Sequence, residues 1–159
     1  MSSLYKEAEQ ALRRGDAAAG KERLEALVRA FPRDTMADSA RFELALLAKQ
    51  GGDQREALAR IREILDHGSS GSFGEPAHFL RCRVYLEEDR AAAETCLERF
   101  VRDYPRSPHD EVALRALVEL SRARGQCSKA SQLAATYLQR HPKGPFAEEA
   151  ARVRSHCGD

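Results

Sequence analysis

The sequence predicts an all-α fold in which short helical hairpins stack on one another. Its 159 residues include 26 Ala, 21 Arg and 17 Leu, which favour helices, but only 11 residues of the β-branched types Val, Ile and Thr, which favour strands. Apolar residues recur every three to four positions, as an amphipathic helix requires. A pattern of helix, tight turn, helix and stop also recurs about every 37 residues. Together, these observations indicate an array of helical repeats rather than a sheet protein.

The repeat is marked by its turns and its stops. Each stop follows its turn by about fifteen residues, and successive stops are 36 or 37 residues apart. The stops are Phe31-Pro32, His67-Gly68, Tyr104-Pro105 and His141-Pro142, and the turns are Gly15-Asp16, Gly51-Gly52-Asp53, Glu88-Asp89 and Gly125-Gln126. We therefore expect one domain, residues 1–159, with four hairpins at about 2–32, 34–68, 74–105 and 107–142.

In the first two hairpins, Asp16 and Asp53 are expected to cap the second helices, because a carboxylate accepts hydrogen bonds from the unpaired N–H groups of a first turn. Glu56 follows Asp53 by three residues and completes a capping box. Pro32 ends the first hairpin, since the residue before a proline avoids the helical conformation. The repeat pattern is then interrupted by a Gly/Ser-rich stretch, residues 67–74, whose composition predicts a flexible joint.

In the third hairpin, Asp89 is expected to cap the second helix in the same way. Ser107-Pro108 and Gly144-Pro145 each place a capping residue before a proline at a first helical position, where the missing N–H costs nothing. The second of these pairs opens a final helix, residues 145–157, which is expected to cap the array.

The second helices share a pattern of small and large residues. Twelve positions before the terminal proline stand Gly20, Ala93 and Ala130, and bulkier residues lie nearer the proline. Small residues allow two helices to approach closely, and the bulky ones fill the space toward the next hairpin. A single hairpin cannot bury both of its faces, so stability must come from stacked neighbours.

These offsets resemble the tetratricopeptide repeat (TPR), a helix-turn-helix unit of about 34 residues. The usual Trp and the Gly-Tyr signature of the first helix are missing, so the resemblance is to a divergent subgroup. The segment 104–114 resembles the "YP-x-SP-x-x-x-x-AL" junctions of bacterial envelope TPR proteins of the barrel-assembly lipoprotein and Tol-Pal coordination types. The ending 141–150 resembles the C-terminal TPR regions of FecR-like regulators. The resemblance implies a right-handed TPR superhelix of four hairpins plus a C-terminal capping helix, acting as a non-enzymatic protein-interaction scaffold.

The four cysteines bear on the compartment, and none of them lies in a CxxC pair. Cys82 and Cys96 lie seven residues on either side of the third turn, so they can face each other in an antiparallel hairpin. Cys127 opens the second helix of the fourth hairpin and Cys157 closes the final helix, and antiparallel neighbours bring these ends together. We expect the disulfides Cys82–Cys96 and Cys127–Cys157, which would indicate an oxidising compartment. The alternatives are four buried free thiols, or a metal site of Cys127, His156 and Cys157.

Several function classes lack a signature in this sequence. A formal net charge of +1 gives no general attraction to nucleic acid or anionic lipid, and the Arg residues interleave with Glu and Asp. No segment approaches the ~18 consecutive apolar residues that span a membrane, and the first residues do not read as a secretory signal. Metal-ligand spacings, a phosphate-binding loop and a nucleophile elbow are not found. We therefore expect no enzymatic activity, no cofactor, no nucleic-acid partner and no membrane insertion.

In the TPR family, the first helices line a concave groove that binds a protein or peptide. A shift of 37 residues aligns Arg41, His78 and Arg115, which predicts a basic column that binds a carboxylate or an acidic partner segment. Glu119 and Arg122 continue the polar stripe of the helix that carries Arg115. The alternative is that these are ordinary exposed polar positions.

The resemblance favours the soluble TPR part of a longer cell-envelope protein, located in the periplasm and acting in envelope assembly, motility or signalling. Two alternatives stay open at this point: a cytoplasmic TPR adaptor with reduced cysteines, and the C-terminal sensor domain of a FecR-like anti-sigma regulator. Phe73 and Phe146 are expected either to cover repeat ends or to form a contact between two copies of a homo-oligomer.

Overall fold

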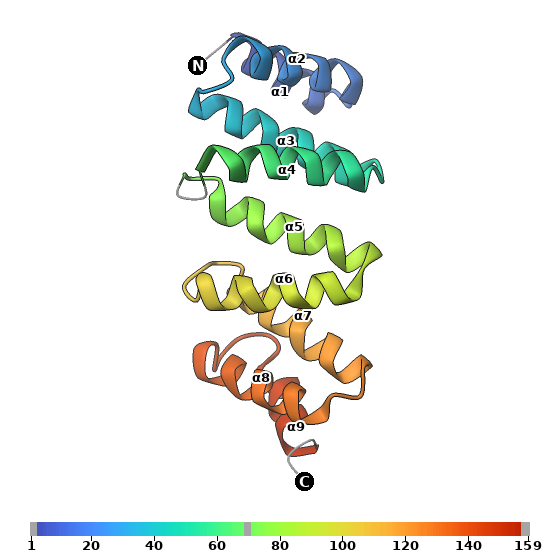
Figure 1. Cartoon of the computed structure of the whole chain (residues 1–159), viewed down its shortest axis with the longest axis vertical. Coiled ribbons are helices and arrows are strands. Elements are labelled where there is room, and N and C mark those ends of the chain that lie inside the picture. Colours follow the sequence, from blue (N-terminus) through green and yellow to red (C-terminus); the bar gives the residue numbers. More distant parts are fainter. Residues whose placement is uncertain (1–2, 69–70, 157–159) are drawn as a thin grey trace. The chain divides into compact units, whose positions relative to one another are not determined.

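The computed structural model describes residues 3–68 and 71–156, and this part of the chain forms nine helices and no strand (Figure 1). The helices are α1 (Ser3–Arg13), α2 (Ala17–Ala30), α3 (Thr35–Gln50), α4 (Gln54–Gly68), α5 (Gly74–Glu88), α6 (Arg90–Asp103), α7 (Asp110–Ala123), α8 (Cys127–Arg140) and α9 (Ala147–His156). The predicted all-α class is confirmed.

The chain divides into two compact units, residues 1–84 and 85–159. The division lies within α5 and therefore beyond the Gly/Ser stretch that was predicted as a joint. Residues 69 and 70 of that stretch lie outside the described residues. Phe73, from the end of the same stretch, packs against the core of the first unit.

In the first unit, α3 takes part in two separate core clusters. One cluster joins α1, α2 and α3 through residues such as Leu24, Leu27 and Leu44. The other joins α3, α4 and α5 through Ala45, Ile61 and their neighbours. Burying a leucine or isoleucine side chain contributes about 1.5–3 kcal/mol. Because neighbouring residues of α3 belong to different clusters, α3 needs helices on both sides to bury its apolar side chains, as expected for stacked hairpins.

In the second unit, α6 packs on α7, α7 on α8, and α8 on α9. The core contains Phe100, Leu114, Leu117 and Tyr137, each with 2% or less of its surface exposed. The ring of Tyr137 meets the ring of Phe146 edge-on, with the centroids 5.3 Å apart. Phe146 itself is 7% exposed, so its ring belongs to the core of this unit.

The three predicted aspartate N-caps are confirmed, but the reciprocal half of the capping box is not formed, because the N–H of Asp53 bonds to the carbonyl of Ala48 and Glu56 accepts from Arg60. Asp16 accepts a hydrogen bond from the backbone N–H of Ala19 at 3.0 Å, and Asp53 accepts one from Glu56 at 2.9 Å. Asp89 accepts two, from Ala91 and Ala92, each at 3.0 Å. The turns that precede α2, α4 and α8 each contain a glycine with positive φ. By contrast, the single residue Asp89 joins α5 to α6. The third turn is thus shorter and needs no left-handed residue.

Two helices begin later than predicted. We expected Pro108 and Pro145 to occupy first helical positions, but α7 begins at Asp110 and α9 at Ala147. The backbone N–H of Asp110 bonds to the carbonyl of Ser107, three residues earlier, and that of Ala147 bonds to Gly144 in the same way. Each proline therefore lies in a tight turn that precedes the regular helix.

The small positions in the second helices have the predicted role. Ala93 and Ala130 are fully buried. A Cβ atom added to Gly20 would lie 2.4 Å from Cδ2 of Leu12, so the Leu12 side chain occupies the space that a larger residue on α2 would need.

Candidate functional site

The structure answers part of the cysteine prediction. Cys82 of α5 and Cys96 of α6 form the predicted disulfide. Cys127, at the start of α8, is also disulfide-bonded, while its predicted partner Cys157 lies outside the described residues. No described cysteine is free. A disulfide sulfur lacks the thiolate that zinc binds, so Cys127 does not fit the alternative metal site with His156.

Arg41, predicted to head a basic column, has its side chain inside the first unit. Only 3% of the residue is exposed. Its guanidinium donates to Asp38 at 2.8 Å and to the backbone carbonyl of Pro32 at 2.8 Å, and its Nε lies 3.4 Å from Glu63 of α4. These contacts tie the turn after α2 to α3 and α4, which is a structural role.

His78, the second residue of that predicted column, is half-buried on α5. Its Nδ1 lies 2.9 Å from Nη2 of Arg81, one turn further along the same helix. An Arg guanidinium only donates, so Nδ1 accepts this hydrogen bond.

The three residues predicted on α7 do lie together on one exposed face of that helix. The side chains of Arg115, Glu119 and Arg122 are 56%, 51% and 49% exposed. Val112 lies one turn earlier on the same face and is 56% exposed, which is unusual for a large apolar residue. We call these four residues the α7 stripe.

The α7 stripe is held in place by contacts within the second unit. Arg115 donates to Glu119 at 2.9 Å, and its guanidinium carbon lies 5.4 Å from the ring centroid of Phe146. Arg122 donates to Glu149 of α9 at 2.8 Å. Glu119 also lines a cavity of about 320 Å³ beside α7. The stripe therefore offers an apolar residue and charges of both signs next to a hollow.

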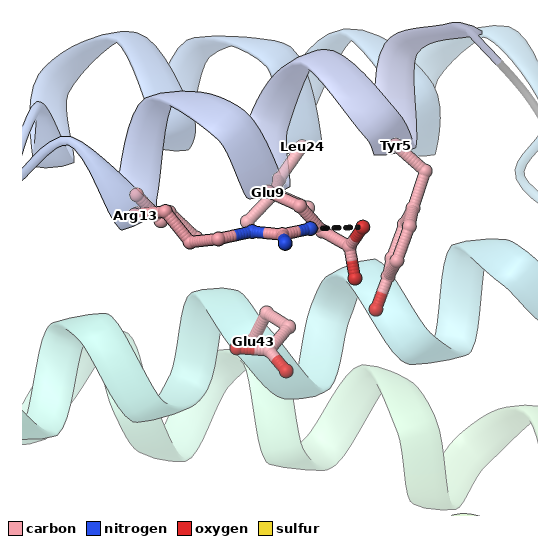
Figure 2. A pocket seen from close by; sticks show the side chains of 6 residues that line it. Tyr5, Glu9, Arg13, Leu24 and Glu43 are labelled. Atoms are coloured by element: carbon pink, nitrogen blue, oxygen red, sulfur yellow. Dashed lines mark hydrogen bonds and ion pairs between the residues drawn. The ribbon is translucent and has the colours of Figure 1, made fainter.

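The first unit contains a second cavity, which the sequence analysis missed. It has a volume of about 230 Å³, lies between α1 and α3, and is lined by Tyr5, Glu9, Leu12, Arg13, Leu24 and Glu43. Figure 2 shows the Tyr5 hydroxyl and the Glu9 carboxylate of α1 on the side that faces α3, where Glu43 lies. Residues 5, 9 and 13 are four apart, so they share a face of α1. That spacing was the available signal, but it could not reveal Glu43 opposite.

The electrostatics of this α1–α3 cavity are negative. Arg13 pairs with Glu9, with Nη2 3.3 Å from Oε2 (Figure 2). Burial raises the pKa of Glu43, and the nearby charge of Glu9 raises it further. Burial, Glu43 and Glu9, in that order, raise the pKa of Tyr5. Within the described part of the chain, Glu43 makes no hydrogen bond or ion pair.

The comparison that decides the family is a match of the chain to a family model described as an outer membrane lipoprotein, YfiO, over residues 1–153. The chain belongs to the YfiO outer membrane lipoprotein family. It is of the TPR class and bacterial-envelope type, as the sequence predicted. TPR-like proteins are protein-interaction modules, and the family and fold support such a scaffold here.

Solved structures support the same fold for this YfiO-family chain. MamA from Desulfovibrio magneticus RS-1, residues 41 to the end, is 16% identical with a TM-score of 0.70, covering 99% of this chain and 91% of that one. TPR-like repeats of a putative kinesin light chain from Podosopora anserina are 16% identical with a TM-score of 0.70, covering 98% and 83%. A TPR protein from Thermus thermophilus is 23% identical with a TM-score of 0.55, covering 94% and 79%. At these identities the likeness shows the fold alone.

A search of curated proteins finds no match to the chain. None of the helices in the described residues combines the length and the apolar character needed to cross a membrane.

Proposed function

We propose that this YfiO-family chain is a non-enzymatic docking scaffold that works in the periplasm, in envelope assembly, motility or signalling. The observation that carries the proposal is the family match over residues 1–153, because it joins a TPR-type interaction fold to an outer membrane lipoprotein family. The α7 stripe is the proposed contact surface for the partner protein. An exposed valine flanked by charges of both signs suits a partner surface with an apolar patch and polar rim.

The disulfides support the periplasm over the cytoplasm. Cys82, Cys96 and Cys127 are all oxidised, and such bonds persist in oxidising compartments but are rare where thioredoxin and glutathione keep thiols reduced. A cytoplasmic adaptor with reduced cysteines is therefore the less favoured alternative. A FecR-like regulatory domain would also be exported, and a transmembrane helix with a FecR-like region encoded upstream would distinguish it from a lipoprotein.

The compartment is tested by trapping thiols in cells of the native host. Cells are quenched in acid, and free thiols are alkylated under denaturing conditions before mass spectrometry. We expect no alkylation of Cys82, Cys96 or Cys127, and full alkylation in a control sample that is reduced first. Alkylation of all three without reduction would contradict the periplasmic location and favour the cytoplasmic adaptor.

The contact surface is tested by charge reversal. Arg115→Glu places a carboxylate beside Glu119 and removes the cation from the ring of Phe146, so we expect loss of partner binding. Arg106→Glu is the matched control, because Arg106 is exposed in the same unit and lies outside the stripe. Equal recovery of crosslinked partner with both variants would refute the stripe as the contact surface.

A further inference from the structure

The α1–α3 cavity of the first unit combines an apolar wall with a negatively charged end. Leu12, Leu24 and the ring of Tyr5 supply apolar surface, while Glu9 and Glu43 supply carboxylates and Tyr5 a hydroxyl. At about 230 Å³ the cavity lies below the range of about 300–1,000 Å³ that holds a drug-sized ligand. It has room for one side chain, but not for a helix or a cofactor.

The charges in this cavity are not balanced by the residues that line it. Arg13 is the one cation among the lining residues; its side chain is 75% exposed, and it pairs with Glu9. Glu43 has no partner in the described part of the chain, although its carboxylate is half-buried and close to another carboxylate. A partly desolvated carboxylate without a cation is unfavourable, and a cationic ligand would relieve that cost.

The shape and charge together select the ligand. Lysine and arginine bury an apolar stem along apolar surface and carry a cation at the end. A hydrogen bond from such a cation to a carboxylate is shorter and stronger than one between neutral groups. An anionic ligand would meet two carboxylates. The described residues contain no group of three or more His, Cys, Asp and Glu side chains that could hold a metal ion.

We propose that the α1–α3 cavity binds a lysine or arginine side chain of a partner polypeptide. Glu43 accepts the ion pair, Glu9 and the Tyr5 hydroxyl supply further hydrogen-bond acceptors, and the stem of the ligand lies on Leu12 and Leu24. This inference rests on the proposed docking function and adds to it the chemistry of one anchor residue. The cavity lies in the first unit, whereas the α7 stripe lies in the second, so the two surfaces are tested separately.

The test uses short peptides as probes and the whole chain as the target. Acetyl-Ala-Lys-Ala-amide and its neutral analogue, acetyl-Ala-norleucine-Ala-amide, are titrated into isotopically labelled protein at low ionic strength, where charge pairs are least screened. Amide resonances are followed by NMR. We expect the lysine peptide to shift resonances of α1 and α3 and to bind roughly tenfold more tightly than the norleucine peptide.

Two variants separate the site from general charge. Glu43→Gln should reduce the affinity for the lysine peptide roughly tenfold, while Glu22→Gln, at an exposed position of α2 in the same unit, should leave it unchanged. Glu43→Gln removes a repelling charge and should fold normally, which the NMR spectrum itself verifies. Equal binding of the two peptides, shifts confined to other helices, or an unchanged affinity in Glu43→Gln would each overturn the proposal.

A separate arm distinguishes this inference from the docking function. The partner recovered by crosslinking from the native host is tested against the wild-type chain and Glu43→Gln. Equal binding of the partner to both would refute the cavity as its anchor site and leave the scaffold function intact. Failure of the wild-type chain to bind any envelope protein would instead refute the scaffold function.

Discussion

At the scale of single residues, Gly144 lies against a hydrogen-bonded tyrosine that leaves no room for a side chain. The Tyr137 hydroxyl donates to Glu111 at 2.5 Å and accepts from the backbone N–H of Phe146 at 3.1 Å. A Cβ atom added to Gly144 would lie 2.3 Å from that hydroxyl and 2.7 Å from Glu111 Oε1. Space for the tyrosine therefore depends on the absence of a side chain at position 144.

We predict that Gly144→Ala destabilises the protein by about 2 kcal/mol, because overpacking forces these groups apart. Thermal unfolding followed by circular dichroism should show a midpoint several degrees lower. Gly51→Ala is the control: its Cβ would meet its nearest neighbour at 3.4 Å, an ordinary contact, and its φ of −77° suits any residue. Equal midpoints for the two variants would contradict this account.

Asp110 is a fully buried carboxylate in the second unit. It accepts hydrogen bonds from Arg140 at 2.7 Å and from Nε2 of His141 at 2.7 Å, and so joins the start of α7 to the end of α8. We predict that Asp110→Asn costs about 3 kcal/mol, because it leaves the Arg140 guanidinium without its charged partner. Asp103→Asn removes an exposed carboxylate that pairs with Arg99 and should have no measurable effect. Similar unfolding free energies for both variants would show that the buried pair is not important.

Glu43 and Glu94 are carboxylates whose pKa values move in opposite directions. Hydrogen bonds from Lys129 and, to a smaller extent, Arg124 lower the pKa of Glu94, whereas burial raises that of Glu43. A group whose pKa is lowered in the folded protein stabilises the fold at pH values above its unfolded-state pKa of about 4.3. This stabilisation is lost as the pH falls through the folded-state pKa. A group whose pKa is raised in the folded protein contributes stability below its unfolded-state pKa of about 4.3, and this contribution is lost as the pH rises through the folded-state pKa.

At pH 7 we therefore predict a higher midpoint for Glu43→Gln and a lower one for Glu94→Gln, each relative to the wild type. As the pH is lowered, the difference in midpoint between Glu43→Gln and the wild type should disappear near pH 4. The difference between Glu94→Gln and the wild type should persist to lower pH. The measurement is thermal unfolding between pH 3 and pH 7. Differences of the same sign would refute the assignment of the two environments.

At the scale of the helices, the Cys82–Cys96 disulfide links α5 and α6 across the shortest turn. A loop of this length is expected to contribute about 3 kcal/mol, because the bond restricts the unfolded chain. We predict that the double variant Cys82→Ala/Cys96→Ala has a lower unfolding midpoint than the oxidised wild type. Added reductant should lower the midpoint of the variant less than that of the wild type. An equal response to reductant would mean that this bond does not contribute to stability.

Helix ends show what local sequence determines. Asp16, Asp53 and Asp89 could be predicted as caps, since each bond joins a side chain to a backbone group within three residues. The starts of α7 and α9 could not be placed as well, because a proline after Ser or Gly fits a tight turn as readily as a first helical position. At the start of α9, the backbone N–H of Phe146 donates to the hydroxyl of Tyr137 on α8, a contact that the local sequence does not reveal.

At the scale of the whole chain, the repeat and its family were predictable because they depend on spacing. The side-chain partners were not. The sequence places Arg41 at a repeated position, but its burial arises from Asp38, Glu63 and the carbonyl of Pro32 converging from three segments. The cavity at Glu43 likewise exists only because α3 packs against α1. The common face of Arg115, Glu119 and Arg122 was predictable because it depends on spacing within one helix, whereas the exposure of Val112 was not predicted.

The central claim is that the chain docks an envelope protein through the α7 stripe. Site-specific photocrosslinking in cells of the native host tests it most directly. A photoreactive amino acid replaces Val112 in the stripe or, as a control, Phe31, the other exposed large apolar residue among those described. The account predicts a crosslink to an envelope protein from position 112 and none from position 31. Crosslinks from position 112 only to cytoplasmic proteins, or to no protein, would contradict it.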